Sequence, residues 1–336
     1  MPPLPLTLAG LEFADPALSE SVREGLDRVE HGLREAVRSD FDAVGEPARH
    51  LVEAGGKRFR PLLTLLAAHV GDPRAPGVVD AAVVVELTHL ATLYHDDVMD
   101  EASVRRGAVS ANARWSNTVA ILTGDFLFSR ASSVLAGLGP DAVRIQARTF
   151  ERLVTGQIRE TAGAPPGSDG VDHYLRVLDE KTGSLIATCA LFGGLFSGAP
   201  APAVEVLRRY GEAIGIAFQL SDDLLDVASD SAESGKTPGT DLREGVRTLP
   251  VLYALRSPAV DEASRRLREL LAVLPPDESA MDETLALLRR SPAMDEARAV
   301  LVSFAERARA VLDDLPDVPA RAALLALADY VVARTG

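Results

Sequence analysis

Apolar residues recur at helical spacing along most of the chain. Two clear examples are residues 62–70 and 83–91, where leucine, valine and alanine return every three or four positions. Runs that alternate apolar and polar residues, as half-buried strands require, are absent. Clusters of glycine and proline divide the chain into segments of roughly 15 to 30 residues, which is typical of packed helices. The pattern therefore predicts an all-α helical bundle.

No change in composition marks a boundary between domains, and nothing repeats at the fixed short period of a solenoid. The chain begins Met1-Pro2-Pro3-Leu4-Pro5 and has no basic residue before Arg23, so it lacks the positive region of a signal peptide. We therefore expect a short mobile tail over residues 1–14 and a single domain over residues 15–336.

The composition narrows the choice of partners. The chain has 35 Lys and Arg against 49 Asp and Glu, a net charge of −14, and is 47% hydrophobic, which is ample for a large core. Such an acidic protein is a poor match for nucleic acid or an anionic membrane. The single cysteine, Cys189, excludes an internal disulfide framework and a cysteine-based zinc site. We expect a soluble protein in the reducing cytoplasm.

One uncharged stretch, residues 182–204, is long enough to span a bilayer. It contains several glycine and serine residues and Pro200, which a membrane span uses less readily than leucine or valine. A helix buried inside a large protein explains the stretch better, so stable membrane insertion is not expected.

Two acidic clusters share one pattern. Residues 94–100 and 220–226 each carry Asp-Asp-x-x-Asp, formed by Asp96, Asp97 and Asp100 in the first and by Asp222, Asp223 and Asp226 in the second. On a helix, the first and last aspartates lie one turn apart on the same face. Such a cluster alone is more often a solvated helix end, but two copies that each follow an apolar segment favour a functional site in a cavity.

Carboxylate oxygens favour a hard cation. Two acidic patches suit several Mg²⁺ ions that keep some waters and share a diphosphate. A di-iron site is the competing metal interpretation, because Glu86-Leu87-Thr88-His89 is a Glu-x-x-His; such bundles need two copies of this motif and the sequence has one.

Basic residues accompany the acidic clusters. Of the basic residues only three are lysines, Lys57, Lys181 and Lys236, and all three lie in short glycine- or threonine-containing motifs. Because arginine supplies nearly all of the positive charge, a lysine at one of these positions suggests a need for a compact point charge. Each basic group alone is more often solvated surface. Together they predict two diphosphate sites, one that binds through metal and one that binds directly through Lys, Arg and His.

The ordered motifs resemble those of the trans-isoprenyl diphosphate synthases, also called polyprenyl synthetases. The matching segments are Gly-Gly-Lys-x-x-Arg-Pro at 55–61, Asp-Asp-x-x-Asp with Arg-Arg-Gly at 96–107, Lys-Thr at 181–182, Phe-Gln-x-x-Asp-Asp-x-x-Asp at 218–226, Gly-Lys at 235–236 and Thr-Leu-Pro at 248–250. The resemblance implies an all-α bundle around a deep central cavity, a homodimer, and head-to-tail addition of isopentenyl diphosphate to an allylic diphosphate.

The resemblance also implies roles for individual residues. It makes Asp96, Asp100 and Asp222 direct ligands of about three Mg²⁺ ions per active site, with Asp97, Asp223 and Asp226 acting through metal-bound water. The allylic diphosphate would be held by Arg105, Lys181, Thr182, Gln219 and Lys236. The isopentenyl diphosphate would be held by Gly56, Lys57, Arg60, His89 and Arg106.

One segment departs from the family pattern. Where the family often has Gly-Lys before Thr-Leu-Pro, this chain reads Gly245-Val246-Arg247-Thr248-Leu249-Pro250. Arg247 lies one position after the expected lysine, so its role stays open.

The implied reaction separates charge, so it depends on cations at the diphosphate and on the exclusion of water. Departure of the allylic diphosphate creates negative charge on oxygen and a cation on carbon; metal and basic residues stabilise the first, and a dry apolar cavity protects the second. Asp96→Ala or Asp222→Ala is expected to lower turnover by several orders of magnitude. Each change also removes a like-charged neighbour, so we expect unchanged or raised stability without ligand.

Product length is predicted from the helix that carries Asp96. Its preceding turns would present Ala91 and Thr92, then Leu87 and Thr88, then Val84 to the cavity, and each turn rises about 5.4 Å, roughly one isoprene unit. Short-chain members of the family resemble one another in having Phe or Tyr where this chain has the small residues Ala91 and Thr92. We therefore expect a product longer than geranylgeranyl diphosphate, of the kind used for isoprenoid quinone side chains. An ordinary packing role for Ala91 is the alternative.

Three other functions compete with a long-chain synthase. A short-chain farnesyl or geranylgeranyl diphosphate synthase would share every motif. A terpene cyclase shares the first aspartate motif but binds one diphosphate, so it has no use for Lys57, Arg60 and Arg106. A non-catalytic partner subunit of a synthase need not keep both acidic clusters, and this chain has both.

Overall fold

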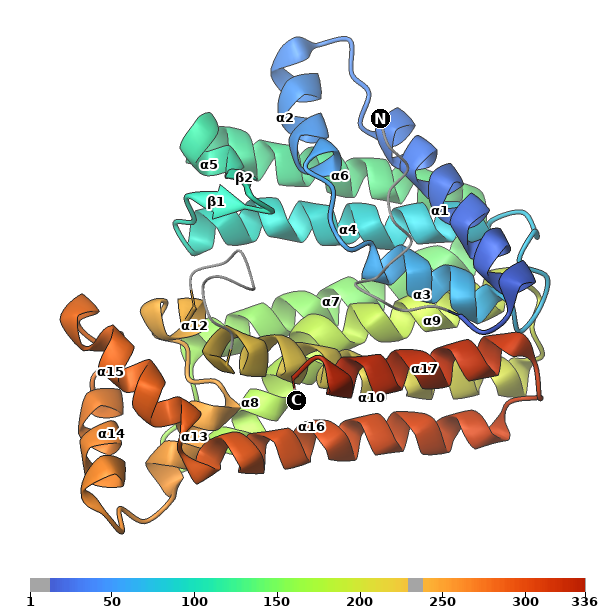
Figure 1. Ribbon diagram of the computed structural model, residues 1–336. Coiled ribbons are helices and arrows are strands. Elements are labelled where there is room, and N and C mark those ends of the chain that lie inside the picture. Colours follow the sequence, from blue (N-terminus) through green and yellow to red (C-terminus); the bar gives the residue numbers. More distant parts are fainter. Residues whose placement is uncertain (1–12, 229–237, 336) are drawn as a thin grey trace. The chain divides into compact units, whose positions relative to one another are not determined.

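Helices make up most of the described chain, and its one sheet is a two-stranded hairpin, which confirms the predicted all-α fold (Figure 1). The structure, a computed structural model, describes residues 13–228 and 238–335. Residues 1–12 of the predicted tail and Lys236 therefore lie outside the described residues. The α-helices are α1 (Pro16–Ala36), α2 (Asp42–Glu53), α3 (Phe59–Ala68), α4 (Val78–Met99), α5 (Ala111–Arg114), α6 (Asn117–Leu138), α7 (Pro140–Ala162), α8 (Gly170–Leu178), α9 (Ser184–Phe196), α10 (Ala201–Ala228), α12 (Thr240–Arg243), α13 (Leu249–Arg256), α14 (Glu262–Ala272), α15 (Glu278–Arg289), α16 (Pro292–Val311) and α17 (Pro319–Ala333).

Three short elements complete the described fold. They are a π-helical turn η1 (Asp179–Gly183), a 3₁₀ turn η2 (Leu312–Asp314) and an antiparallel hairpin of β1 (Val104–Arg105) and β2 (Ala108–Val109). The sequence pattern did not predict the hairpin, because strands of two residues are too short to show alternation.

The described residues fall into two compact units. The first is drawn from Met1–Phe150, Leu185–Gly211 and Val311–Ala326. The second is drawn from Glu151–Ser184, Glu212–Ala310 and Leu327–Gly336. Helices α7, α10 and α17 each contribute residues to both units.

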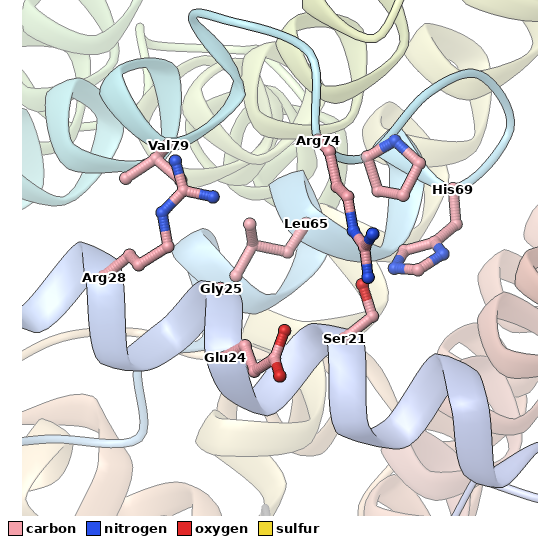
Figure 2. A pocket seen from close by; sticks show the side chains of 9 residues that line it. Ser21, Glu24, Gly25, Arg28, Leu65, His69, Arg74 and Val79 are labelled. Atoms are coloured by element: carbon pink, nitrogen blue, oxygen red, sulfur yellow. The ribbon is translucent and has the colours of Figure 1, made fainter.

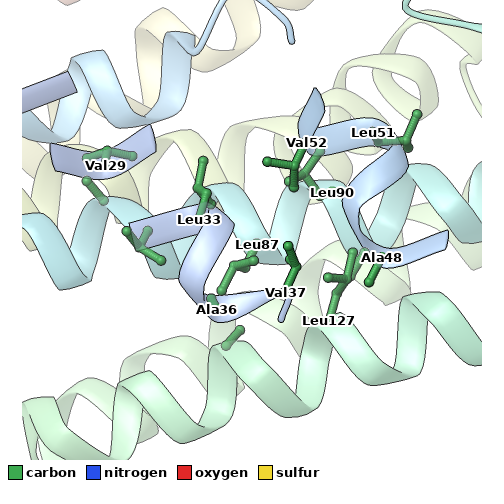
Figure 3. Packing of buried hydrophobic residues seen from close by; sticks show 14 of the residues in the cluster. Val29, Leu33, Ala36, Val37, Ala48, Leu51, Val52, Leu87, Leu90 and Leu127 are labelled. Atoms are coloured by element: carbon green, nitrogen blue, oxygen red, sulfur yellow. The ribbon is translucent and has the colours of Figure 1, made fainter. Parts of the chain in front are cut away.

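Helix α4 is central to the first unit and packs against α1, α3 and α6. Its apolar residues lie all around the helix rather than on one stripe, as expected for a buried helix. Figure 3 shows Leu87 and Leu90 of α4 among Leu33 of α1, Leu51 of α2 and Leu127 of α6, all fully buried. This core fixes the position of the first acidic cluster, which lies at the end of α4.

Two described helices, α4 and α6, are long and apolar enough to cross a membrane. In the most apolar window of each, 67% of α4 is buried inside the fold but only 33% of α6. Burial inside the fold accounts for the apolar character of α4. The face of α6 that carries Ile121 and Leu122 is exposed.

The uncharged stretch at 182–204 contains a buried helix, as predicted, but not one continuous helix. Helix α9 ends at Phe196, and α10 begins at Ala201. Glycines let α9 pack closely: a Cβ on Gly193 would lie 2.2 Å from the Thr64 carbonyl oxygen of α3, and one on Gly211 of α10 would lie 2.6 Å from Ala187 Cα. These glycines are therefore required by backbone contact.

In the second unit, the π-helical turn η1 joins α8 to α9. Helix α7 approaches this turn so closely that a Cβ on Gly156 would lie 2.5 Å from the backbone nitrogen of Lys181. Single π turns inside helices are uncommon and often occur at functional sites. The turn contains two predicted substrate-binding residues, Lys181 and Thr182.

Candidate active site

The first acidic cluster lies in the last turn of α4. Asp97 points inward and is fully buried, whereas Asp96 is half-buried and Asp100 is exposed. Arg105 Nε donates a hydrogen bond to Asp97 Oδ1, and its Nη2 lies 3.7 Å from Asp100 Oδ2. Burial raises the pKa of Asp97, although the charge of Arg105 opposes the shift. Asp97 is thus held by an internal cation, while Asp96 and Asp100 are more accessible.

The β1–β2 hairpin (Figure 1) carries both predicted arginines, and each contacts a carboxylate of α4: Arg105 contacts Asp97 and Arg106 contacts Glu86. Its two turn residues, Arg106 and Gly107, have φ values of 54° and 76°. Positive φ at both central positions is the geometry of a tight turn whose twist matches paired strands. The turn sends Arg105 towards Asp97 and Arg106 towards the glycine-rich loop before α3.

That loop and Arg106 fit together closely. Arg106 Nη1 donates to the carbonyl oxygens of Gly55 and Leu51. Gly56 has a φ of 137°, and a Cβ there would lie 2.8 Å from Arg106 Cζ. Only glycine satisfies both constraints. Gly56 and Arg106, which the resemblance assigns to one substrate, are therefore brought together.

His89 lies on α4 near several arginines. Desolvation lowers the pKa of His89 well below its ordinary value, and the charges of Arg60, Arg106, Arg105 and Arg58 lower it further. The imidazole is thus neutral and can act as a hydrogen-bond donor or acceptor. A concentration of cations around a neutral polar ring suits a diphosphate.

The second acidic cluster lies in the last two turns of α10. Asp223 is buried, and Asp222 and Asp226 are half-buried. Asp223 accepts hydrogen bonds from Tyr174 Oη and, at 2.9 Å, from Gln219 Nε2. Burial raises the pKa of Asp223 to about 7; these hydrogen bonds oppose the shift, and the charges of Asp222 and Asp226 add to it.

The predicted allylic residues of the second unit join this cluster. Thr182 Oγ1 donates to Gln219 Oε1 at 3.2 Å, so Thr182, Gln219, Asp223 and Tyr174 form a chain of hydrogen bonds. Lys181 pairs with Glu160 of α7. The structure therefore joins Thr182 to Gln219, with Lys181 next to Thr182 in η1, whereas Lys236 is outside the described residues.

Asp226 contacts the start of α12. Its carboxylate accepts the backbone N–H groups of Thr240 and Asp241, both at 3.1 Å. Asp241 belongs to this acidic group, because burial and the charges of Asp223 and Asp226 raise its pKa well above the ordinary value. Arg247 is exposed between α12 and α13, and no described contact assigns it a role.

The two clusters are alike in a way that bears on metal binding. In each, the middle aspartate is buried and neutralised or hydrogen-bonded, and the outer two are more accessible. Asp97 Oδ2 is also a buried oxygen without a hydrogen-bond partner among the described residues. No group of three or more His, Cys, Asp or Glu in the described ranges forms a complete metal cage. Mg²⁺ commonly binds through one or two carboxylates plus substrate phosphates, so these all-oxygen patches fit that ion.

The predicted chain-length residues lie on two sides of α4. Leu87 and Ala91 belong to the core cluster and have no exposed surface. Thr88 instead accepts a hydrogen bond from Gln146 Nε2 of α7 at 2.8 Å. Thr92 is half-buried, and Val84 is fully buried.

Sequence reasoning did not assign several residues of these groups to the site, among them Asp241, Tyr174, Arg334 and Glu86. Tyr174 reaches Asp223 from 49 positions away, and no motif surrounds it. Arg334, near the C-terminal end of α17, lies 2.8 Å from Asp222 Oδ1 and also donates to the Phe218 carbonyl oxygen. Glu86 was noticed only as part of the possible iron motif. Its partners are arginines instead.

A small cavity of about 140 Å³ lies apart from these residues, between α1, α3 and the start of α4. Figure 2 shows Arg28, Arg74, His69 and Glu24 around it. None of the residues predicted to bind substrate lines this cavity.

Comparison with known proteins identifies the family. The protein-family model for "Polyprenyl synthetase" matches residues 42–288. The chain is 53% identical over 330 residues to nonaprenyl diphosphate synthase of Mycobacterium tuberculosis, covering 98% of each protein. It also resembles the crystal structure of geranylgeranyl pyrophosphate synthase from Corynebacterium glutamicum complexed with calcium and isoprenyl diphosphate, with a TM-score of 0.85, 44% identity, and coverage of 97% of this chain and 100% of that chain.

A decaprenyl diphosphate synthase from Rhodobacter capsulatus gives the same TM-score of 0.85 at 37% identity, covering 95% of this chain and 99% of that one. The identity and coverage of these relatives, with the family match over most of the chain, leave no other assignment. As its motifs predicted, the chain belongs to the polyprenyl synthetase family.

Proposed function

We propose that this chain is a trans-polyprenyl diphosphate synthase. It condenses isopentenyl diphosphate with an allylic diphosphate, head to tail, to a product longer than geranylgeranyl diphosphate. The observation that carries the proposal is the pair of acidic clusters with the same internal arrangement, accompanied by a separate cationic group around His89. A terpene cyclase has no use for that second anion site.

Each predicted residue receives a role in this proposal. Asp96, Asp100 and Asp222 ligate Mg²⁺, and Asp97, Asp223 and Asp226 act through metal-bound water. Support for the indirect role of Asp97 and Asp223 comes from their burial and their internal partners. Asp226 is half-buried, and its carboxylate already accepts the backbone N–H groups of Thr240 and Asp241. The allylic diphosphate is assigned to Arg105, Lys181, Thr182, Gln219 and Lys236. The isopentenyl diphosphate is assigned to Gly56, Lys57, Arg60, His89 and Arg106.

The chemistry is charge separation followed by carbon–carbon bond formation. Bound Mg²⁺ supplies positive charge for the oxygens of the departing diphosphate. Arg105 and Lys181 each pair with a carboxylate, and a diphosphate oxygen would compete for the same donors. Arg60, Arg106 and neutral His89 orient the isopentenyl diphosphate, whose double bond attacks the allylic carbon. The proton lost in the last step is assigned to the departing diphosphate, as the family resemblance implies.

The long product is supported by two kinds of observation. Ala91 and Thr92 are small where short-chain members resemble one another in having an aromatic residue. Two of the relatives described above are named nonaprenyl and decaprenyl synthases, and one is named a geranylgeranyl synthase. We assign the product to the long-chain class and to isoprenoid quinone side chains.

The test is a product assay with purified protein, radiolabelled isopentenyl diphosphate and farnesyl diphosphate. After phosphatase treatment, a long-chain synthase gives prenyl alcohols of more than about twenty carbons, and a short-chain synthase stops there. A hydrocarbon product would instead indicate a cyclase, and no product from a folded protein would indicate a partner subunit. Removing Mg²⁺ with a chelator should abolish turnover, and adding Mg²⁺ back should restore it.

The active assembly is assigned to a homodimer. Helix α6 is strongly apolar, yet Ile121 is 43% exposed and Leu122 is 61% exposed. An exposed apolar face on an otherwise well-packed unit marks an interaction surface. A second copy of the same chain is the partner that the family resemblance implies. We place this dimer in the cytoplasm, since the one cysteine is free and buried.

A further inference from the structure

Glu86 is a buried carboxylate without a role in the proposed chemistry. Its side chain is 2% exposed, and it lies on α4 in the turn before His89. Its Oε1 accepts hydrogen bonds from Arg58 Nη1 at 3.0 Å and from Arg106 Nη2 at 3.4 Å. One carboxylate oxygen thus joins two guanidinium groups from different parts of the first unit.

Arg58 holds the loop that leads into α3. Its φ and ψ are 47° and 35°, a left-handed conformation that is strained for a non-glycine residue. The guanidinium group donates to the carbonyl oxygens of Val52 and Gly55 and to Glu30 of α1, as well as to Glu86. Burial lowers the pKa of Arg58, but hydrogen bonds and charges from Glu30 and Glu86 outweigh it, and the net pKa is raised.

Arg106 closes the other side of the same loop. It donates through Nη1 to Gly55 and Leu51 and through Nη2 to Glu86. Among the described residues, these contacts leave Nε–H and one Nη2 proton for a ligand, because a guanidinium group has five N–H donors. Without Glu86, Arg106 would keep its hydrogen bonds to the loop. It would lose the hydrogen bond through Nη2 that fixes the orientation of its guanidinium plane.

Glu86 therefore controls the orientation of residues that belong to the isopentenyl diphosphate site. We propose that Glu86 is a positioning residue for that site, holding Arg106 and the 55–58 loop in the arrangement that binds the diphosphate. The inference rests on the proposed function, and it explains the Glu-x-x-His sequence without iron. Glu86 contacts protein groups only, so it acts through Arg106.

The test compares two glutamates that share a partner. Glu86→Gln removes the charge that spans both arginines and keeps the side-chain shape. Glu30→Gln is the matched control, because Glu30 binds Arg58 but has no described contact with Arg106. We expect Glu86→Gln to raise KM for isopentenyl diphosphate about tenfold, with kcat and KM for the allylic substrate within about twofold. We expect Glu30→Gln to leave both KM values within about twofold.

A double-mutant cycle tests the route through Arg106. In an Arg106→Lys background, adding Glu86→Gln should change KM for isopentenyl diphosphate little, because the geometry that Glu86 fixes is already lost. If the two effects multiply, Glu86 does not act through Arg106 and the inference is wrong. Equal changes in both KM values, or a change matched by Glu30→Gln, would show a general structural role and also overturn it.

Folding is checked by the melting temperature of each variant. Should Glu86→Gln fail to fold, Glu86→Asp replaces it: the shorter side chain keeps the charge but cannot span both guanidinium groups, so the same selective rise in KM is expected. An unchanged KM in a folded variant refutes the inference. The proposed function fails separately, if the wild-type protein makes no prenyl diphosphate.

Discussion

At the scale of single residues, Asp222 shows how a structural contact changes a sequence-based expectation. Like-charge repulsion predicted that Asp222→Ala would leave stability unchanged or raise it. Its carboxylate, however, lies 2.8 Å from Arg334, whose side chain is only 9% exposed and also lies 4.5 Å from the Phe218 ring. Asp222→Ala should therefore lower the free energy of unfolding by about 1 kcal/mol and lower turnover about a thousandfold or more.

Thermal unfolding and steady-state kinetics check both parts of this expectation. The double variant Asp222→Ala with Arg334→Leu should recover part of the stability, because no buried charge is left unpaired, although Ser221 Oγ and the Phe218 carbonyl oxygen lose their Arg334 donor. It should not recover turnover. Normal turnover in the Asp222→Ala variant would contradict the metal role of Asp222. Raised stability in that variant would show that repulsion among the aspartates outweighs the ion pair with Arg334.

His89 gives a prediction about pH. Its pKa in the folded protein is well below the ordinary value near 6.5, through desolvation first and then the neighbouring arginines. Below pH 6.5 the unfolded chain therefore binds a proton that the folded protein does not, and stability falls as the pH falls, by at most about 1.4 kcal/mol per pH unit. Denaturant unfolding between pH 5 and 7.5 should show this slope. The slope should be smaller in His89→Gln; an identical slope would assign the effect to other groups.

Among helices and loops, the apolar pattern predicted the features that local sequence determines, such as the helices and their ends. It missed the features that contacts between distant residues determine. The helical character of α4 follows from its leucine and valine spacing, and the end of α9 is marked by Ser197, Gly198 and Pro200. The site motifs were found because each is contiguous. Tyr174 and Arg334 were not found, because each is linked to the site only through a contact with an aspartate far along the chain. No local sequence pattern encodes such a contact.

Helix α4 also yields a test of product length. Ala91 has no exposed surface and lies in the core cluster, so a phenylalanine there must displace packed side chains. Thr92 is half-buried on another side of the helix. We expect Thr92→Phe to shorten the products to about twenty carbons or fewer with turnover retained, since one turn spans roughly one isoprene unit. We expect Ala91→Phe to lower the melting temperature more.

Chromatography of dephosphorylated products gives the chain lengths. Thr92→Val, which has nearly the same volume as the native residue, serves as the control and should leave the product distribution unchanged. An unaltered distribution in a folded, active Thr92→Phe enzyme would show that this side of α4 does not limit the chain.

For the molecule as a whole, the exposed face of α6 predicts the assembly. Burying a leucine side chain gains about 1.5–3 kcal/mol, so exposed Ile121 and Leu122 favour association with a second copy. The wild-type protein should have twice the 35.6 kDa chain mass in light scattering. Leu122→Glu places a charge in that contact and should shift the mass to one chain, because a desolvated, unpaired carboxylate is costly. Val260→Glu, at a position that is 85% exposed, is the matched control and should stay dimeric. A wild-type monomer, or a Leu122→Glu dimer as stable as the wild type, would remove α6 as the contact surface.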